Sequence, residues 1–296
     1  MHKALVLAAA VLSAAPAHAR DGKRIFVSVD MEGIGGVVTD QQLGTAGFEY
    51  QKFRELMTEE ANAAIAAARE AGATEFVVAD SHGSFQNLLP DKFAADVQLV
   101  RGAPRPLTMM QGIDDSFDGV IYIGYHSSTS NTEGVRAHTM SSAYMADLKL
   151  NGVSVTEGAW NAALAGHFGV PILAVSGDEA AVKEVQALVP GIEGAVVKWP
   201  YGFHAARVLS PEASRQLIRE AVKKAMARRT QLVPQRVKTP VEVEIRFKAY
   251  RPVEVLGWLP LFKRVDAHSV RFSAKDMLEA TRILAFVMNY QFDLQP

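Results

Sequence analysis

Three short apolar runs in this chain each end at residues whose side chains can bind a metal ion. The runs cover residues 25–29, 75–79 and 120–123, and the polar side chains that follow them are Asp30, Glu32, His82 and His126. Continuous apolar runs of this length, separated by helical patterns, are typical of buried parallel strands. Because ligands gather at the carboxyl ends of parallel strands, two carboxylates and two imidazoles would meet at one sheet edge. The spacing therefore predicts a metal site at that edge.

Each of these residues also has a simpler interpretation when it is taken alone. Asp30 and Glu32 are two positions apart, so an extended backbone puts both on one face, where like charges repel unless a cation or hydrogen-bond donors compensate. They could instead form a polar turn in water. His82 and His126 could be ordinary turn histidines. Their joint position favours a site, in which Asp80 would orient an imidazole or shape the turn.

A further histidine follows this set. His138 comes after His126 beyond a polar loop of Ser, Thr, Asn and Gly residues. Such a loop suggests mobility near the site, and a histidine at its far end could transfer a proton or polarise a carbonyl group. A loop histidine that is hydrogen-bonded to the backbone is the alternative. The residues alone leave both interpretations open.

The elements that would position these side chains form an α/β pattern. Expected strands cover residues 25–29, 75–79, 120–123 and 170–175. Between the first two, Thr58 is the expected N-cap of a helix that stops before Gly72. Alternation of strands and helices predicts an α/β fold with a largely parallel, three-layer sheet.

Two segments depart from this alternation. Residues 147–155 alternate between apolar and polar on both sides of Asn151-Gly152, which predicts an inserted β-hairpin. In the C-terminal part, residues 241–247 and 268–274 alternate like half-exposed antiparallel strands. We therefore expect an α/β metal-binding catalytic domain over residues 20–198 and a smaller α+β unit over residues 199–296.

The first nineteen residues have the pattern of a secretory signal peptide. A short positive start precedes an apolar segment, and Ala17-His18-Ala19 forms a cleavage site. The apolar segment is too short for a membrane span, which needs about 20 apolar residues. We expect a mature chain that begins near Arg20, lies in the periplasm or outside the cell, and has no membrane attachment after cleavage.

Composition narrows the partners and the metal ligands. The chain has 31 basic and 32 acidic residues and a formal net charge of −1, which gives no basic footprint for nucleic acid. It has no cysteine, so thiolate sites and disulfides are excluded. Any metal would be held by His, Asp and Glu.

Several segments resemble the zinc-dependent, self-compartmentalising D-aminopeptidase family. The similarity runs in order along the mature chain, through residues 27–34, 57–62, 80–82, 124–126 and 275–279. The resemblance implies two zinc ions per subunit, with five ligands at Asp30, Glu32, His82, His126 and Glu157. Asp30 is the implied bridge between the metals. Glu157 enters only through the resemblance, since by position it is an ordinary carboxylate in the first turn of a helix.

The same resemblance implies a catalytic role for His138. The family has a histidine in a His-Ser-Met setting, and here His138-Thr-Met140 differs by one residue. It also implies a homodecamer of two stacked pentameric rings. The implied activity is removal of the N-terminal residue, a D-amino acid such as D-Ala, from short peptides by a hydroxide shared between two zinc ions.

Two other functions fit the residues. A different dinuclear metallohydrolase, acting on phosphate esters or other amides, would use the same two-metal chemistry. A periplasmic binding protein could use a metal-supported cleft without turnover. Such proteins usually have two similar α/β lobes, which the dissimilar C-terminal part does not favour.

Overall fold

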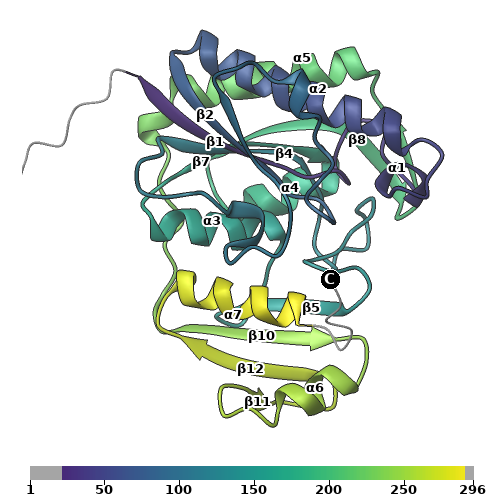
Figure 1. Ribbon diagram of the computed structural model, residues 1–296, viewed down its shortest axis with the longest axis vertical. Coiled ribbons are helices and arrows are strands. Elements are labelled where there is room, and N and C mark those ends of the chain that lie inside the picture. The colour runs from purple at the N-terminus through teal and green to yellow at the C-terminus, as the bar shows by residue number, and fades with distance from the viewer. Residues whose placement is uncertain (1–21, 291–296) are drawn as a thin grey trace, which may run out of the picture.

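Two β-sheets stacked through helices make up the molecule (Figure 1). The computed structural model describes residues 22–290, so the predicted signal peptide lies outside the described residues. The larger sheet has the strand order β3-β2-β1-β4-β7-β8-β9, and the smaller sheet has the order β11-β12-β10-β5-β6. Neither order follows the chain, because the strands are joined by crossover helices and by one excursion between the sheets.

The larger sheet is parallel except for its last strand. Its strands are β1 (Lys23–Val29), β2 (Ala73–Asp80), β3 (Val97–Val100), β4 (Gly119–Tyr125), β7 (Ile172–Asp178), β8 (Glu193–Gly202) and the antiparallel β9 (Ala205–Val208). The strands of the smaller, antiparallel sheet are β5 (Met145–Leu150), β6 (Val153–Ser154), β10 (Val241–Phe247), β11 (Lys263–Arg264) and β12 (Ser269–Ala274).

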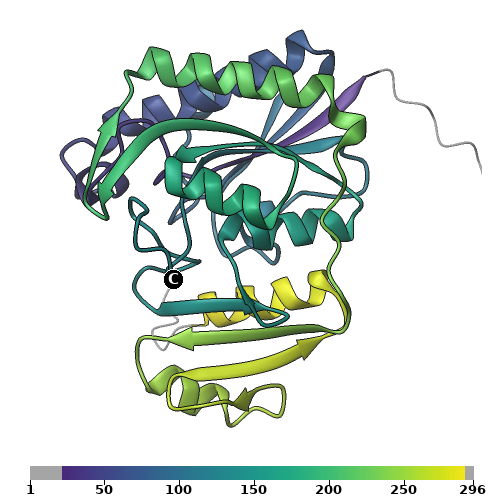
Figure 2. The same cartoon turned by 180° about the vertical axis from the view of Figure 1, so that it is seen from behind.

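Helices cover both faces of the larger sheet. The helices are α1 (Asp40–Leu43), α2 (Tyr50–Glu70), α3 (Glu157–His167), α4 (Glu179–Leu188), α5 (Pro211–Ala227), α6 (Arg251–Leu256) and α7 (Met277–Asn289). Short 3₁₀ turns lie at Pro90–Lys92, Thr108–Met110 and Arg229–Gln231. Helices α2 and α5 pack on one face and α3 and α4 on the other (Figures 1 and 2). This confirms the predicted α/β fold with a largely parallel three-layer sheet.

Apolar side chains on both faces explain why the central strands are buried. All seven residues of β4 and all seven of β7 are buried, as expected for strands covered by helices on both sides. The first strand of the chain, β1, lies between β2 and β4, so three carboxyl ends emerge side by side. This arrangement brings the ends of the three apolar runs to one edge.

The N-cap expected at Thr58 is wrong. Helix α2 begins at Tyr50, and Thr58 lies inside it with its hydroxyl donating to the carbonyl of Arg54 at 2.8 Å. Buried Tyr50 and Phe53 already have helical spacing, and this burial extends the helix before the threonine. The other end is as predicted, since Gly72 has a φ of +87° just beyond the last turn.

The inserted hairpin joins the smaller sheet. Asn151 and Gly152 both have positive φ, at 50° and 85°, as a two-residue hairpin turn requires. Strand β5 then pairs with β10, so the hairpin completes the antiparallel sheet. The expected boundary between residues 198 and 199 falls inside β8. The smaller sheet contains strands from both sides of that boundary. The division into two domains stays a prediction.

One more helix ties the two sheets together. Helix α7 lies on the smaller sheet and faces α3 of the larger unit (Figure 1). Trp160 of α3 is fully buried, and its indole N–H donates to the hydroxyl of Thr281 in α7 at 3.2 Å. No helix within residues 22–290 is both long and apolar enough to cross a membrane.

Candidate metal centre

The carboxyl ends of β1, β2 and β4 deliver the four predicted side chains to one place. Asp30 and Glu32 lie just beyond β1, His82 lies beyond β2, and His126 follows β4. Asp30 and Glu32 are only 2% and 6% exposed, which rules out a polar turn in water. The expected convergence at one sheet edge is therefore what the structure shows.

A glycine lets the first loop lie against the end of β4. The amide of Gly33 donates to the carbonyl of Gly124 at 2.7 Å. A Cβ atom at position 33 would lie 2.0 Å from the carbonyl oxygen of Tyr125, so a larger residue would push the loop away. The contact fixes Glu32 beside the strand end from which His126 projects.

Asp30, Glu32 and His82 form one half of the cluster. The Nδ1 atom of His82 lies 2.8 Å from a carboxylate oxygen of Glu32 and 3.5 Å from one of Asp30. Each residue offers one ligand atom, and these atoms lie within 4.8 Å of one another. The geometry suits a single cation bound by all three.

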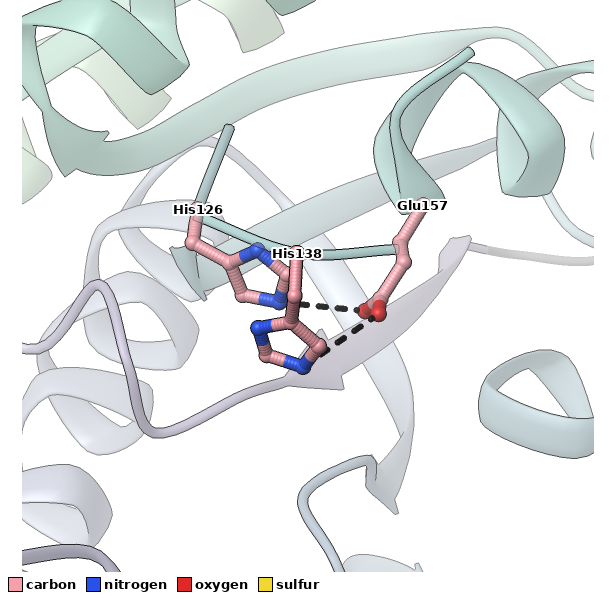
Figure 3. Close-up of side chains that lie close together, drawn as sticks. All are labelled: His126, His138 and Glu157. Atoms are coloured by element: carbon pink, nitrogen blue, oxygen red, sulfur yellow. Dashed lines mark ion pairs between the residues drawn. The ribbon is translucent and has the colours of Figure 1, made fainter. Parts of the chain in front are cut away.

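His126, His138 and Glu157 form the other half (Figure 3). The Nε2 atom of His126 lies 3.4 Å from a Glu157 oxygen, and Nε2 of His138 lies 3.8 Å from the other oxygen of that carboxylate. The two rings stack with centroids 3.9 Å apart and planes 11° from parallel. Glu157 is the first residue of α3, whose N-cap is Thr156. Carboxylates are favoured at that end of a helix.

Asp30 joins the two halves. One of its oxygens faces His82, and the other lies 3.2 Å from Nε2 of His126. That second oxygen and Nε2 of His126 are both buried, and neither has a hydrogen-bond partner among residues 22–290. A cation between them would satisfy both atoms, so the residues present fit a metal. Oxygen and imidazole donors of this kind suit Zn²⁺ and also Mn²⁺ or Co²⁺.

Backbone carbonyls orient all three imidazoles. Nε2 of His82 lies 2.8 Å from the carbonyl oxygen of Leu43. In the other two rings Nδ1 makes the equivalent contact, His126 with Ser127 at 3.0 Å and His138 with Arg136 at 2.9 Å. A carbonyl can only accept, so each of these ring nitrogens carries the proton. The opposite nitrogen of His82 and of His126 faces the carboxylates, and it could bind a metal ion placed between them, as in ligating histidines.

Burial and mutual charge shift the pKa values of the cluster. Burial raises the pKa of Asp30, and the neighbouring Glu32 raises it further. Burial would also raise the pKa of Glu32 and Glu157, but the facing imidazoles hold both below their usual values. Burial disfavours charged His82 and His126, yet the carboxylates raise their pKa well above the usual value. The cluster is therefore a set of buried charges that must compensate one another.

An open cavity of about 400 Å³ adjoins the cluster. Its lining includes Asp30, Glu32, His82, His138 and Glu157 from the larger unit. Met288 and Asn289 of α7, which packs on the smaller sheet, line the opposite side of the cavity. A small molecule in the cavity would meet both the cluster and His138, which makes this cavity the candidate active site.

Lys198 holds the loop that carries Glu32, and the sequence analysis did not single it out. Its side chain is fully buried in β8 and donates to the backbone carbonyls of Glu32, Ile34 and Val37, the last two at 3.1 and 2.6 Å. A lone lysine inside an otherwise apolar strand is the sequence signal for such a role. Burial lowers its pKa to about 8.

Glu60 of α2 supports the same loop from the other side. One carboxyl oxygen accepts a hydrogen bond from the amide of Gly35 at 3.0 Å, and the other oxygen is buried and has no partner among the described residues. Burial raises the pKa of Glu60 from 4.5 to about 7, although the Gly35 amide lowers it in part. The carboxyl group is therefore protonated in the folded protein over a range in which the unfolded chain is ionised.

This raised pKa predicts a stability that falls as pH rises through the window from 4.5 to about 7. The folded state binds the extra proton, so its advantage is full below the window and lost above it. Between about pH 5 and about pH 8, the wild type should lose roughly 2 kcal/mol more free energy of unfolding than Glu60→Gln, which has no proton to lose. Urea unfolding of both proteins at the two pH values measures the difference. Parallel pH profiles would contradict the assignment.

Asp80 does not contact the cluster through its side chain. Its buried carboxylate accepts hydrogen bonds from the backbone amides of Asn87 and Leu88 at 2.5 and 2.7 Å. Asn87 in turn donates to the carbonyl of His82 at 2.6 Å. Asp80 therefore shapes the turn that carries His82, one of the two roles expected for it.

Comparisons with known proteins agree over nearly the whole chain. The Peptidase M55 family model, described as D-aminopeptidase, matches residues 23–286. A D-aminopeptidase of Bacillus subtilis (strain 168) is 35% identical over 258 residues, which cover 87% of this chain and 93% of that protein. Among solved structures, a Zn-dependent D-aminopeptidase from Bacillus subtilis, described as a self-compartmentalizing protease, matches with a TM-score of 0.86 and 34% identity. The match covers 91% of this chain and 99% of that one.

Proposed function

The chain belongs to the Peptidase M55 family of D-aminopeptidases, and from this premise we propose that it removes the N-terminal D-amino acid, such as D-Ala, from short peptides with two zinc ions. It is a zinc-dependent hydrolase. The observation that carries the two-metal proposal is the position of Asp30, whose two oxygens face different histidines between two adjoining groups of possible metal ligands. Backbone carbonyls orient the rings so that Nδ1 of His82 and Nε2 of His126 face these carboxylates.

The proposed ligands divide between two ions that share one carboxylate. Asp30, Glu32 and His82 would hold the first ion, and Asp30, His126 and Glu157 the second. The two oxygens of Asp30 face different histidines, which supports its role as the bridge. When bound, the zinc ions supply Lewis-acid polarisation of the scissile carbonyl and lower the pKa of a water toward neutrality.

The chain's own groups bind the peptide and handle its protons. The free amino terminus of the substrate would meet the cluster at the cavity wall, where Glu32 and Glu157 would hold metal, and this would restrict cleavage to the first residue. His138 lines the cavity, whereas His126 is only 1% exposed behind it. We assign His138 the contact with substrate, where its Nε2 atom can take a proton from the attacking water and pass it to the leaving amine.

Stereochemistry and metal content test the proposal together. The purified protein should hydrolyse D-Ala-D-Ala in preference to L-Ala-L-Ala, contain two zinc ions per chain by elemental analysis, and lose activity on chelation. A clear L preference would contradict the substrate. One zinc or none in the active enzyme would contradict the dinuclear centre.

Substitution of His138 separates catalysis from metal binding. His138→Gln should lower kcat by about 10²–10⁴, the range for loss of a positioned acid or base, while the zinc content stays the same. His167→Gln, at the end of α3, is the matched control and should keep full activity. A loss of one zinc ion per chain in His138→Gln would instead make His138 a ligand.

Assembly and location are further proposals. The relative described as self-compartmentalizing supports a homo-oligomer, and we propose the decamer of two stacked pentameric rings that the family resemblance implies. The pattern of residues 1–19 supports export to the periplasm or the medium. Sedimentation of the exported protein should give ten chains per particle, each beginning near Arg20. A monomer with an intact N-terminus would contradict both proposals.

A further inference from the structure

A buried cation lies in the wall of the active-site cavity and is used by none of the steps above. Arg105 is 6% exposed and lines the same cavity as Asp30, Glu32 and His82. Within residues 22–290 no carboxylate forms an ion pair with it, and its hydrogen bonds go to backbone carbonyls. Burial lowers its pKa to about 10, although the nearby Asp80 carboxylate opposes the shift, and the group stays charged at neutral pH. A buried cation that no carboxylate contacts directly can gain from an anion bound in the cavity.

The guanidinium is held in a fixed orientation. Its Nη2 atom donates to the carbonyl of Asp80 at 2.6 Å, and Nη1 donates to that of Val100 at 3.3 Å. The guanidinium carbon lies 3.7 Å from the centroid of the Phe85 ring, which also lines the cavity. Its remaining donors include a buried Nε–H that has no partner within the described range 22–290. Orientation by stacking and by two carbonyls leaves the group ready to bind a planar anion.

A second unpartnered donor lies in the same wall. Thr108 is 7% exposed and lines the cavity, and its buried hydroxyl has no hydrogen-bond partner in the part of the chain that the structure describes. It belongs to the turn that begins at Arg105, since its amide donates to the Arg105 carbonyl at 3.1 Å. A guanidinium and a hydroxyl on one turn are the donor set that a carboxylate needs.

We propose that Arg105, with Thr108, is the subsite for the C-terminal carboxylate of a short peptide substrate. This inference rests on the proposed function and deepens it. The cavity then presents the metal-binding cluster to the amino end of the substrate and a cation to its carboxylate end. Each residue adds about 3.5 Å of extended chain, so the subsite favours peptides whose length matches the distance between the cluster and Arg105.

A comparison of acid and amide substrates tests the subsite. For wild-type enzyme, kcat/KM for D-Ala-D-Ala should exceed that for its C-terminal amide by roughly tenfold or more, mainly through KM, because a charge-assisted hydrogen bond is lost. Arg105→Gln should lower kcat/KM for the acid by about the same factor and change kcat/KM for the amide little. Thr108→Val should show a smaller change of the same kind.

The matched control is Arg101→Gln, which removes an exposed arginine from the same connection and should leave both substrates unchanged. If Arg105 only holds the Asp80 and Val100 carbonyls, Arg105→Gln would lower kcat/KM for the acid and for the amide by the same factor. Equal hydrolysis of acid and amide by the wild type would overturn the subsite and leave the aminopeptidase intact. If neither is hydrolysed, the proposed function fails, and calorimetric binding of the two peptides to wild type and Arg105→Gln then decides the subsite alone.

Discussion

Burial of three carboxylates at one sheet edge is the constraint on which the rest of this structure depends. Asp30, Glu32 and Glu157 are each at most 6% exposed, and together they carry like charges that water cannot screen. Such an arrangement is unfavourable unless cations lie among them. Either the protonated imidazoles of His82 and His126 supply that positive charge, or zinc ions would supply it with the neutral imidazoles as ligands. The surrounding strands and helices hold these carboxylates and imidazoles close together.

The scaffold holds the set through its backbone more than through other side chains. Parallel strands bring three chain ends together, and the carbonyls of the following loops decide which ring nitrogen of each histidine is free. Lys198 and Glu60 form hydrogen bonds with the backbone of the loop after β1 from two sides. The second unit closes the cavity through α7, which the indole of Trp160 ties to α3. These hydrogen bonds orient the site residues without help from a substrate, as preorganised catalysis requires.

Much of this arrangement could be predicted from the sequence, because strand ends obey a simple geometric rule. Asp30, Glu32, His82 and His126 follow apolar runs, and parallel pairing leaves their strand ends adjacent. Glu157 escapes that rule. The chain leaves the larger sheet, forms the hairpin of the smaller sheet and returns, so only the tertiary path brings the start of α3 to the edge.

Other parts of the site have weaker signals in the sequence. Arg105 stands between prolines and is easily interpreted as a turn residue, and its burial depends on Phe85 stacking over it. The sequence wrongly predicts Thr58 as a helix start, because threonine is a common N-cap residue. The helix begins earlier, where helical spacing of apolar residues already starts. The hairpin joins the smaller sheet because β5 pairs with β10. No local sequence pattern specifies that pairing.

We propose that one buried carboxylate cluster holds two zinc ions, with Nδ1 of His82 and Nε2 of His126 as their imidazole ligands. Diffraction from crystals of the zinc-loaded protein, recorded on both sides of the zinc absorption edge, would locate the ions. We expect two anomalous peaks that share Asp30, one bound by Nδ1 of His82 and the other by Nε2 of His126. A single peak, or a zinc ion bound through Nε2 of His82, would contradict it.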